Sequence, residues 1–494
     1  MIDRAAPIAV TGAGTMGAGI AQVAAVAGHP VILYDAMEGV AGRAVTVIRD
    51  RVARLVDKGR LPGLRVPVEL RLEVAADLGE LTRARCVIEA VAEDLAVKQA
   101  LFADLEEVVA PDCVLATNTS SLSPTAIAAG LSHPGRLVGL HFFNPAPVMR
   151  LVEVVSGLAT DPAVAAAATR LAEDWGKQVV QASATPGFIV NRVARPFYAE
   201  ALRLAEEQAA SPATIDAVLT RAGGFRMGPF ALMDLVGQDV NEAVTRSVWT
   251  AFGYDPRFAP SLLQRSMVEA GWLGRKTGRG WFRYGDDVEP SEPDAAPARS
   301  APMYVIEHGE SPLRVLLARS GVEIRAGEGG DGTVELPGGA VLARCDGRPA
   351  TALGGPAVVV DRTLDDATAE GIAIAASDGC PAAAVDEATG LLQAAGLTVY
   401  PVDDAPGLVV TRTVAMLVNG AVDALHKGVA SAADIDTAMR LGTNYPLGPL
   451  AWGDRWGPAT VLAVLEAMQA WYGEDRYRPS VLLRRMAAAS GSLT

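Results

Sequence analysis

Residues that could carry out acid/base chemistry gather in the first third of the chain. His141, one of only five histidines among 494 residues, lies in an apolar, strand-like run that stops at Asn144 and Pro145. Ser120 precedes this run, and Glu153 follows it inside the run Leu-Val-Glu-Val-Val. An imidazole that accepts a proton, a carboxylate that orients it and a nearby hydroxyl suit proton abstraction without a covalent nucleophile.

Each of these residues also has a structural interpretation. His141 could be a core histidine, and Glu153 could be a solvated strand residue. However, ligands of an open α/β sheet lie beyond the carboxyl ends of its strands, and a carboxylate bracketed by apolar residues needs a partner such as an imidazolium. Ser120 or Ser121 could instead cap the helix that follows Pro124.

Asn191 lies in an apolar helical stretch, where asparagine is a poor helix former and is not easily buried. A surface position is the simplest interpretation. Arg192 and Arg195 could already mark the exposed face of this helix, so an inward-pointing Asn191 amide is also plausible.

A glycine-rich loop near the N-terminus predicts a dinucleotide site. The strand 8–10 runs into Gly-Ala-Gly-Thr-Met-Gly at 12–17, an Ala-rich helix follows, and the next strand, 31–34, ends on Asp35. In such a unit the glycines allow a tight turn and close approach of a pyrophosphate, and the helix N-terminus offers N–H groups to phosphates. Asp35 could accept a hydrogen bond from a ribose 2′-hydroxyl and would repel a 2′-phosphate, so NAD is favoured over NADP. Without this context such a loop could be a purely structural turn.

The order of apolar runs and helical stretches predicts an α/β fold combined with an all-α fold. Further strands are expected at 86–91, 114–116 and 137–140, and a continuous helix at 188–208. The predicted domains are, in order, a doubly wound NAD-binding sheet of the Rossmann type (1–184), a helical substrate and dimerisation domain (185–285), a linker (286–300), a small degenerate α/β domain (301–400) and a second copy of the helical domain (401–494).

The second copy is predicted from an internal repeat with a constant offset of 220 residues. Pro186-Gly187 matches Pro406-Gly407, Gly228-Pro229 matches Gly448-Pro449, and Asp234 matches Asp454. A constant spacing over several landmarks indicates a duplicated helical domain.

Composition and charge exclude several other classes of protein. The net charge of −14 argues against nucleic acid or an anionic membrane as a partner. The four cysteines are irregularly spaced and predict neither a disulfide framework nor a metal site. We find neither a signal peptide nor a membrane-spanning run in the sequence, so a cytoplasmic location is expected.

Together these motifs resemble the L-3-hydroxyacyl-CoA dehydrogenase family, over residues 8 to about 285. The matching segments, in order, are the glycine loop 12–17, Asn-Thr-Ser-Ser-Leu-Ser at 118–123, His-Phe-Phe-Asn-Pro at 141–145, Leu-Val-Glu-Val at 151–154 and Thr-Pro-Gly-Phe-Ile-Val-Asn-Arg at 185–192. The second half is similar to the longer, two-part members of the family found in aromatic-acid degradation, including 3-hydroxyadipyl-CoA dehydrogenases.

The resemblance implies NAD-dependent oxidation of (S)-3-hydroxyacyl-CoA to 3-oxoacyl-CoA in fatty-acid or aromatic-acid degradation, with a substrate of the 3-hydroxybutyryl-CoA or 3-hydroxyadipyl-CoA type. It places the catalytic residues at Ser120, His141, Glu153 and Asn191. It places the NAD contacts at Gly12, Gly14, Thr15, Met16, Gly17, Asp35, Glu93, Lys98, Ser120, Asn144 and Lys276. It places coenzyme A on the helix after Asp35, where Arg51, Arg54 and Lys58 form a basic face that could otherwise be merely solvated.

Family members pair through their helical domains, so the copy could form an internal pseudo-dimer; a homo-oligomer is also possible. At the offset of 220 the residues facing Ser120, His141, Glu153 and Asn191 are Ala340, Asp361, Ala373 and Thr411. One active site per chain is therefore expected. Two alternatives are a β-hydroxyacid dehydrogenase acting on a free acid and a non-catalytic protein that binds NAD or acyl-CoA.

Overall fold

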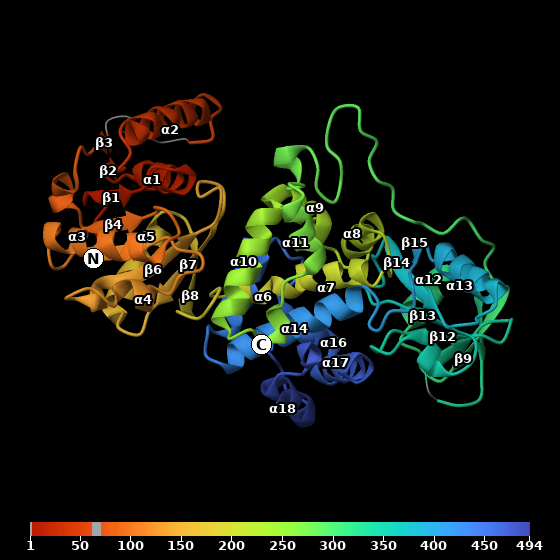
Figure 1. Ribbon diagram of the computed structural model, residues 1–494. Helices are drawn as coiled ribbons and strands as arrows, with labels where there is room; N and C mark the ends of the chain where they lie inside the picture. Colours follow the sequence, from red (N-terminus) through yellow and green to blue (C-terminus); the bar gives the residue numbers. More distant parts are fainter. Residues whose placement is uncertain (1, 62–70, 331) are drawn as a thin grey trace. The chain divides into compact units, whose positions relative to one another are not determined.

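The computed structural model describes residues 2–61, 71–330 and 332–494. The chain forms two compact units, one of Met1–Arg192 with Lys427–Thr443 and one of Val193–His426 with Asn444–Thr494. Figure 1 shows a sheet with helices in the first unit, and a second sheet and a group of helices in the second unit. The predicted fold class, a doubly wound sheet with helical domains and a smaller α/β part, is confirmed.

The first unit is built on one sheet, whose strands follow the order β3-β2-β1-β4-β5-β6-β7-β8. The strands are β1 (Ile8–Thr11), β2 (Val31–Tyr34), β3 (Leu72–Val74), β4 (Cys86–Glu89), β5 (Val114–Thr117), β6 (Leu137–Phe142), β7 (Leu151–Ser156) and β8 (Gln178–Ser183). The helices are α1 (Thr15–Ala27), α2 (Val40–Asp57), α3 (Leu95–Val108), α4 (Pro124–Ala128), α5 (Pro162–Asp174), α6 (Val190–Val193) and α15 (Ala432–Gly442).

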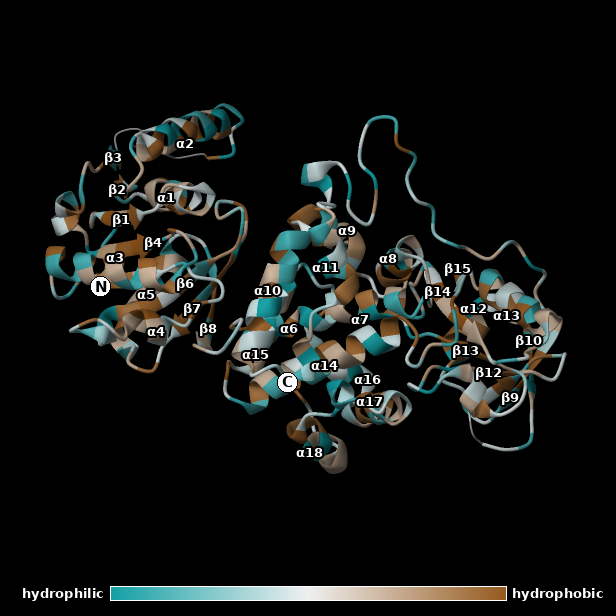
Figure 2. Ribbon diagram, in the orientation of Figure 1, coloured by the Kyte–Doolittle hydropathy of each residue, from teal (hydrophilic) through white to brown (hydrophobic). Residues whose placement is uncertain are grey.

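Helices cover both faces of this sheet because successive strand side chains point to opposite faces. Ile8 and Val10 of β1 pack with α1, α2 and α5 on one face, whereas Ala9 packs with α3 and α4 on the other. Consistent with burial on both sides, the central strands β1 and β4 appear in hydrophobic brown in Figure 2. This two-sided core holds the carboxyl ends of the strands in place.

The sheet is not parallel throughout. The strand β7 runs antiparallel to β6, and this pairing sets His141 directly opposite Glu153. All other neighbouring pairs of the sheet are parallel. The two residues that the sequence separates by twelve positions are therefore cross-strand neighbours.

The second unit holds a seven-stranded mixed sheet in the order β10-β9-β11-β12-β13-β14-β15. The strands are β9 (Tyr304–His308), β10 (Glu323–Ala326), β11 (Thr333–Glu335), β12 (Val341–Arg344), β13 (Ala357–Val360), β14 (Gly371–Ala376) and β15 (Thr398–Pro401). The helices are α7 (Arg195–Glu206), α8 (Pro212–Arg221), α9 (Pro229–Val236), α10 (Gln238–Ala251), α11 (Leu262–Glu269), α12 (Arg314–Ser320), α13 (Ala382–Ala394), α14 (Val410–His426), α16 (Pro449–Trp456), α17 (Pro458–Tyr472) and α18 (Val481–Ala489).

The internal repeat extends further upstream than the sequence predicts. At the same offset of 220 residues, β7 corresponds to β14 and α5 to α13 from the first residue to the last. The strand β13 begins 220 residues after β6. Because strand-forming residues are interchangeable on a buried surface, this part of the repeat keeps its geometry without keeping its sequence.

One prediction about local structure is wrong. The helix expected over 188–208 is interrupted at Ala194, because Pro196 has no N–H to continue the hydrogen-bond ladder. The predicted linker, residues 286–300, contains no helix or strand, and hydrogen bonds hold it against the second unit. There Asp294 accepts hydrogen bonds from Ser211 (2.7 Å) and Thr214 (2.9 Å) at the start of α8.

Among the described residues, no helix is both long and apolar enough to cross a membrane.

Candidate active site

The glycine loop forms the turn between β1 and α1. A side chain would meet different surroundings at each of its three glycines. Gly12 has a φ of +89°, and a Cβ there would lie 2.6 Å from the carbonyl oxygen of Ala90. A Cβ on Gly17 would lie 1.7 Å from the carbonyl oxygen of Gly12. A Cβ on Gly14 would meet nothing within 4 Å. The loop is therefore tightly packed on the inside and open at Gly14, where α1 begins and its N–H groups are available to phosphate.

Asp35 follows β2 and closes one side of the same loop. One of its carboxylate oxygens accepts from the N–H of Ala13 at 2.7 Å, and the other accepts from the N–H of Met37 at 2.9 Å. Asp35, Gly12 and Gly14 line a cavity of about 510 Å³ at the carboxyl ends of β1, β2 and β4. A volume in this range is typical of pockets that enclose a small-molecule ligand or cofactor.

The predicted base and its orienting carboxylate lie in contact. Nδ1 of His141 is 2.6 Å from Oε2 of Glu153, and both side chains are buried. A carboxylate accepts from Nδ1–H, which leaves Nε2 with a free lone pair. Within the described part of the chain Nε2 has no hydrogen-bond partner, whereas the ring packs against Phe143 and Phe188. The imidazole is therefore held in the orientation and tautomer that a general base requires.

Glu153 also connects this pair to the helix that carries Asn191. Its second oxygen, Oε1, accepts from the N–H of Ile189 at 3.1 Å and from the N–H of Val190 at 3.0 Å. The side-chain amide of Asn191 then donates to the backbone oxygen of Ser120 at 3.3 Å. All four predicted catalytic residues consequently belong to one connected set of contacts.

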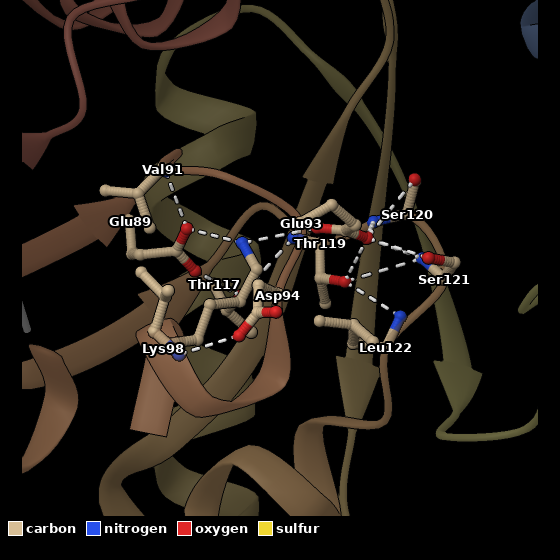
Figure 3. Close-up of polar contacts among 11 residues, drawn as sticks. Glu89, Val91, Glu93, Asp94, Lys98, Thr117, Thr119, Ser120, Ser121 and Leu122 are labelled. Carbon is tan, nitrogen blue, oxygen red and sulfur yellow. Dashed lines mark hydrogen bonds and ion pairs between the residues drawn. The ribbon is translucent and has the colours of Figure 1, made fainter. Parts of the chain in front are cut away.

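Glu93 fixes the loop that carries Ser120, as Figure 3 shows. Its Oε1 accepts from Oγ1 of Thr119 at 2.6 Å, from the N–H of Ser120 at 3.0 Å and from the N–H of Ser121 at 3.1 Å. Burial by itself would raise the pKa of Glu93, but these hydrogen bonds and the charge of Lys98 outweigh burial and lower the pKa. Glu93 is therefore held ionised, and it positions the Ser120 loop through the backbone.

Lys98 is fully buried between two carboxylates. Its ammonium lies 2.5 Å from Glu89 and 3.3 Å from Glu93. Glu89, at the end of β4, also accepts from Thr117 at 2.7 Å. Glu89 is a site residue that was not predicted, although an acid within the apolar run 86–91 is the same signal that pointed to Glu153. A buried charge needs a partner, and Lys98 is that partner.

The other predicted cofactor and coenzyme A residues lie at accessible positions. Thr15 and Met16 begin α1, and Asn144 is exposed just after β6. Lys276 belongs to the second unit, where its ammonium lies 2.5 Å from Asp239. The three basic residues predicted to meet coenzyme A, Arg51, Arg54 and Lys58, are exposed along α2 and at its C-terminal end.

Two structural expectations near the site are wrong. The residue that caps α4 is Ser123, whose hydroxyl accepts from the N–H of Ala126, and neither Ser120 nor Ser121 caps this helix. Arg192 and Arg195 do not mark an exposed face, because both side chains are buried. A guanidinium can be buried when its N–H groups find acceptors and its plane packs on a ring. Arg195 donates to Thr245 at 3.1 Å and packs over Tyr198.

The duplicated half carries a different arrangement at the corresponding place. Asp361, directly after β13, accepts from the N–H groups of Val409 at 3.0 Å and Val410 at 2.7 Å, the repeat partners of Ile189 and Val190. Asp361 therefore anchors the start of α14 in the copy, as Glu153 anchors the start of α6 in the first half. In the repeat, however, Asp361 occupies the position of His141 and not that of Glu153. The sheet register also shows that Asp346, not Ala340, corresponds to Ser120.

No group of three or more histidine, cysteine, aspartate or glutamate side chains that could hold a metal ion occurs in residues 2–61, 71–330 and 332–494.

Three family models match this chain. The NAD-binding domain of 3-hydroxyacyl-CoA dehydrogenase matches residues 7–185, and the C-terminal domain of the same family matches twice, at 187–284 and 407–492. The reduced Rossmann-fold domain of 3-hydroxybutyryl-CoA dehydrogenase matches residues 342–406. The double match agrees with the internal repeat.

Similar proteins cover either the whole chain or its first half. A 3-hydroxyadipyl-CoA dehydrogenase of Escherichia coli is 47% identical over 99% of this chain and 98% of its own length. A probable 3-hydroxybutyryl-CoA dehydrogenase of Bacillus subtilis is 41% identical over 56% of this chain and 96% of its own length. The crystal structure of a 3-hydroxybutyryl-CoA dehydrogenase from Escherichia coli superposes with a TM-score of 0.90, covering 98% of this chain and 99% of the other at 46% identity.

Proposed function

Because the chain belongs to the 3-hydroxyacyl-CoA dehydrogenase family, we propose that His141, Glu153, Ser120 and Asn191 carry out its NAD-dependent oxidation of (S)-3-hydroxyacyl-CoA to 3-oxoacyl-CoA. The observation that carries this proposal is the buried His141–Glu153 contact at 2.6 Å, which leaves Nε2 without a partner among the described residues. NAD, which the glycine loop and Asp35 would hold, would supply the acceptor for the hydride of C3. The protein supplies orientation and the proton acceptor.

Each residue has a separate role. His141 takes the proton of the substrate 3-hydroxyl at Nε2, and Glu153 stabilises the imidazolium that forms. Ser120 holds the hydroxyl, and Asn191 donates to the thioester carbonyl. Glu93 and Lys98 are positioning residues. Glu93 holds the loop that carries Ser120, and Lys98 compensates the negative charge of Glu93.

The activity is tested by following NADH formation with (S)-3-hydroxyacyl-CoA esters of short, medium and dicarboxylic acyl chains. We expect turnover with the thioesters and none with the free 3-hydroxy acids. Turnover of a free acid alone would favour the β-hydroxyacid dehydrogenase alternative. If no ester yields NADH, a non-catalytic binding protein would be the better description.

A second proposal concerns the acyl group. Two matches cover both halves of the chain, and one is named for 3-hydroxyadipyl-CoA and the other for 3-hydroxybutyryl-CoA, so we propose that one of these two esters is the substrate. We propose further that Arg51, Arg54 and Lys58, exposed along and at the end of α2, bind the phosphates of coenzyme A. A cationic face on a protein of net charge −14 supports this assignment.

Asp35→Arg should reverse the cofactor preference. Removing the carboxylate takes away the acceptor for a ribose 2′-hydroxyl, and the new guanidinium favours a 2′-phosphate. We expect the ratio of kcat/KM for NAD to kcat/KM for NADP to fall by about 100-fold, the equivalent of one or two charged hydrogen bonds. Steady-state kinetics with both cofactors measure this ratio, and an unchanged ratio contradicts the ribose role of Asp35.

We propose that the two helical domains form an internal pseudo-dimer. Helices α7 and α14 pack within the second unit, and the buried Arg412 of α14 lies 3.2 Å from the buried Glu200 of α7. At the rim of this contact Arg203 forms an ion pair with Glu474. Such a pairing would allow one chain to complete the contact that family members make between two copies, while association of whole chains would give a homo-oligomer.

One active site per chain follows from the loss of the acid/base residues in the copy. Titration of the protein with NADH, followed by fluorescence, should saturate at one NADH per chain. Light scattering on the same sample gives the number of chains per particle. Saturation at two NADH per chain would contradict the assignment of all cofactor binding to the first half.

The predicted division into domains at 184, 285, 300 and 400 remains part of this proposal. The limits of the matched family models support the boundaries at 184 and 285, and the last model boundary, at 406–407, lies close to 400. A cytoplasmic location is also proposed. The support for this location is chemical, since all four cysteines, which lie in the described part of the chain, are free thiols.

A further inference from the structure

A cavity of about 240 Å³ opens at one edge of the second sheet. It lies at the carboxyl ends of the parallel strands β12 and β13, and β13 is the repeat partner of β6, which carries His141. The carboxyl edge of neighbouring parallel strands is where open α/β sheets bind ligands. The cavity is lined by three arginines, two aspartates and several apolar side chains, among them Arg344, Arg362, Arg455, Asp365, Asp366 and Trp456.

Two of the three arginines are already paired. Arg344 forms an ion pair with Asp366 and donates to the backbone oxygen of Asp361 at 2.7 Å. Arg455 lies 3.3 Å from Asp365. These pairs neutralise both aspartates of the lining, so they leave no carboxylate of the cavity for the third arginine.

Arg362 is the arginine without a carboxylate partner. Its Nε donates to the backbone oxygen of Cys345 at 3.1 Å, and its guanidinium packs over the ring of Trp456. Its two terminal nitrogens make no hydrogen bond or ion pair with any residue in the described ranges. Burial lowers the pKa of Arg362, and the neighbouring charge of Arg344 lowers it further. A partly buried cation with two free donors at a cavity is suited to an incoming anion.

We propose that this cavity binds a small monocarboxylate with a short apolar group. The two free nitrogens of Arg362 match the two oxygens of a carboxylate. The lining carries three positive and two negative charges, hence a net charge of +1, which a monoanion neutralises and a phosphate dianion exceeds. The apolar group contacts Val315 and Trp456, which also line the cavity. The duplicated half has thus exchanged acid/base residues for a carboxylate-binding site.

The test uses the full-length protein and ligand-detected NMR titrations with sodium benzoate, benzamide and inorganic phosphate. Benzoate is expected to bind, and benzamide, which has the same shape without the charge, is expected to bind at least about tenfold more weakly. Arg362→Met should weaken benzoate binding by about tenfold or more, because it removes a charged hydrogen-bonding fork. Phosphate should bind more weakly than benzoate.

The matched control is Arg348→Met, which removes an exposed arginine of the same domain that pairs with Asp346. It should leave benzoate affinity unchanged. If Arg362→Met does not fold, Arg362→Lys keeps the charge, loses the planar fork and should also weaken benzoate binding by about tenfold. Failure of benzoate to bind the wild-type protein, equal affinity in the Arg362 variants, or phosphate binding as tight as benzoate would each overturn the proposal. None of these outcomes depends on dehydrogenase activity.

Discussion

His141→Gln is expected to lower kcat/KM for 3-hydroxyacyl-CoA oxidation by about 100- to 10,000-fold, the usual contribution of a positioned general base. Glutamine fills a similar volume and can still face Glu153, but it cannot accept the proton of the 3-hydroxyl. Steady-state NADH formation measures the loss. NADH affinity, measured by fluorescence, should remain close to that of the wild-type protein.

The control for this variant is His133→Gln, which changes an exposed histidine that precedes β6. It should leave kcat/KM unchanged. A His141→Gln enzyme that retains turnover within about tenfold of wild type, less than the smallest contribution expected of a general base, would show that another group takes the proton.

The second large effect is expected for Glu153→Gln, because this carboxylate has two tasks. It fixes His141 at 2.6 Å and anchors the backbone of Ile189 and Val190. An amide has no negative charge with which to stabilise an imidazolium, and its nitrogen cannot accept from a backbone N–H. We expect kcat/KM to fall by at least about 100-fold, together with a loss of about 2–4 kcal/mol in the free energy of unfolding.

Asp361→Asn separates the two tasks, since Asp361 anchors Val409 and Val410 in the copy without any histidine. This variant should lose about 1–3 kcal/mol of stability, because charged hydrogen bonds to the backbone are weakened. Its kcat/KM should stay at the wild-type value. Urea unfolding and NADH formation measure the two quantities. If both variants lost stability alone, Glu153 would be only a structural anchor.

The sequence predicted those parts of the site that depend on local chain geometry. The glycine loop, the end of β2 at Asp35 and the strand around His141 are each fixed by a few neighbouring residues, whose steric demands can be read from their types. The contact between His141 and Glu153 was expected from chemistry, but its geometry depends on the antiparallel turn from β6 to β7. A parallel sheet would have separated the two residues.

Burial of basic side chains was the part that sequence patterns could not predict. Arg192 and Arg195 look like surface residues because isolated arginines usually are, yet both are buried. Lys98 becomes a buried ion-pair partner only because β4 and α3 bring Glu89 to it. Whether a basic side chain finds such a partner depends on residues that are distant in sequence and close in the fold. A local pattern of residue types therefore cannot predict it.

A segment from late in the chain, residues 427–443, belongs to the first unit, and this affects the order of folding during synthesis. Residues 427–443, which include α15, pack on β7 and β8, and the backbone of Val429 accepts from the N–H of Ser183 at 2.8 Å. When the NAD-binding half has left the ribosome, this helix has not yet been translated. The outer surface of β7, the strand that carries Glu153, is therefore covered only after about 240 further residues have been made. At roughly 5–20 residues per second of translation, this is a delay of tens of seconds. Until then, the surface that α15 will cover is exposed to chaperones and proteases.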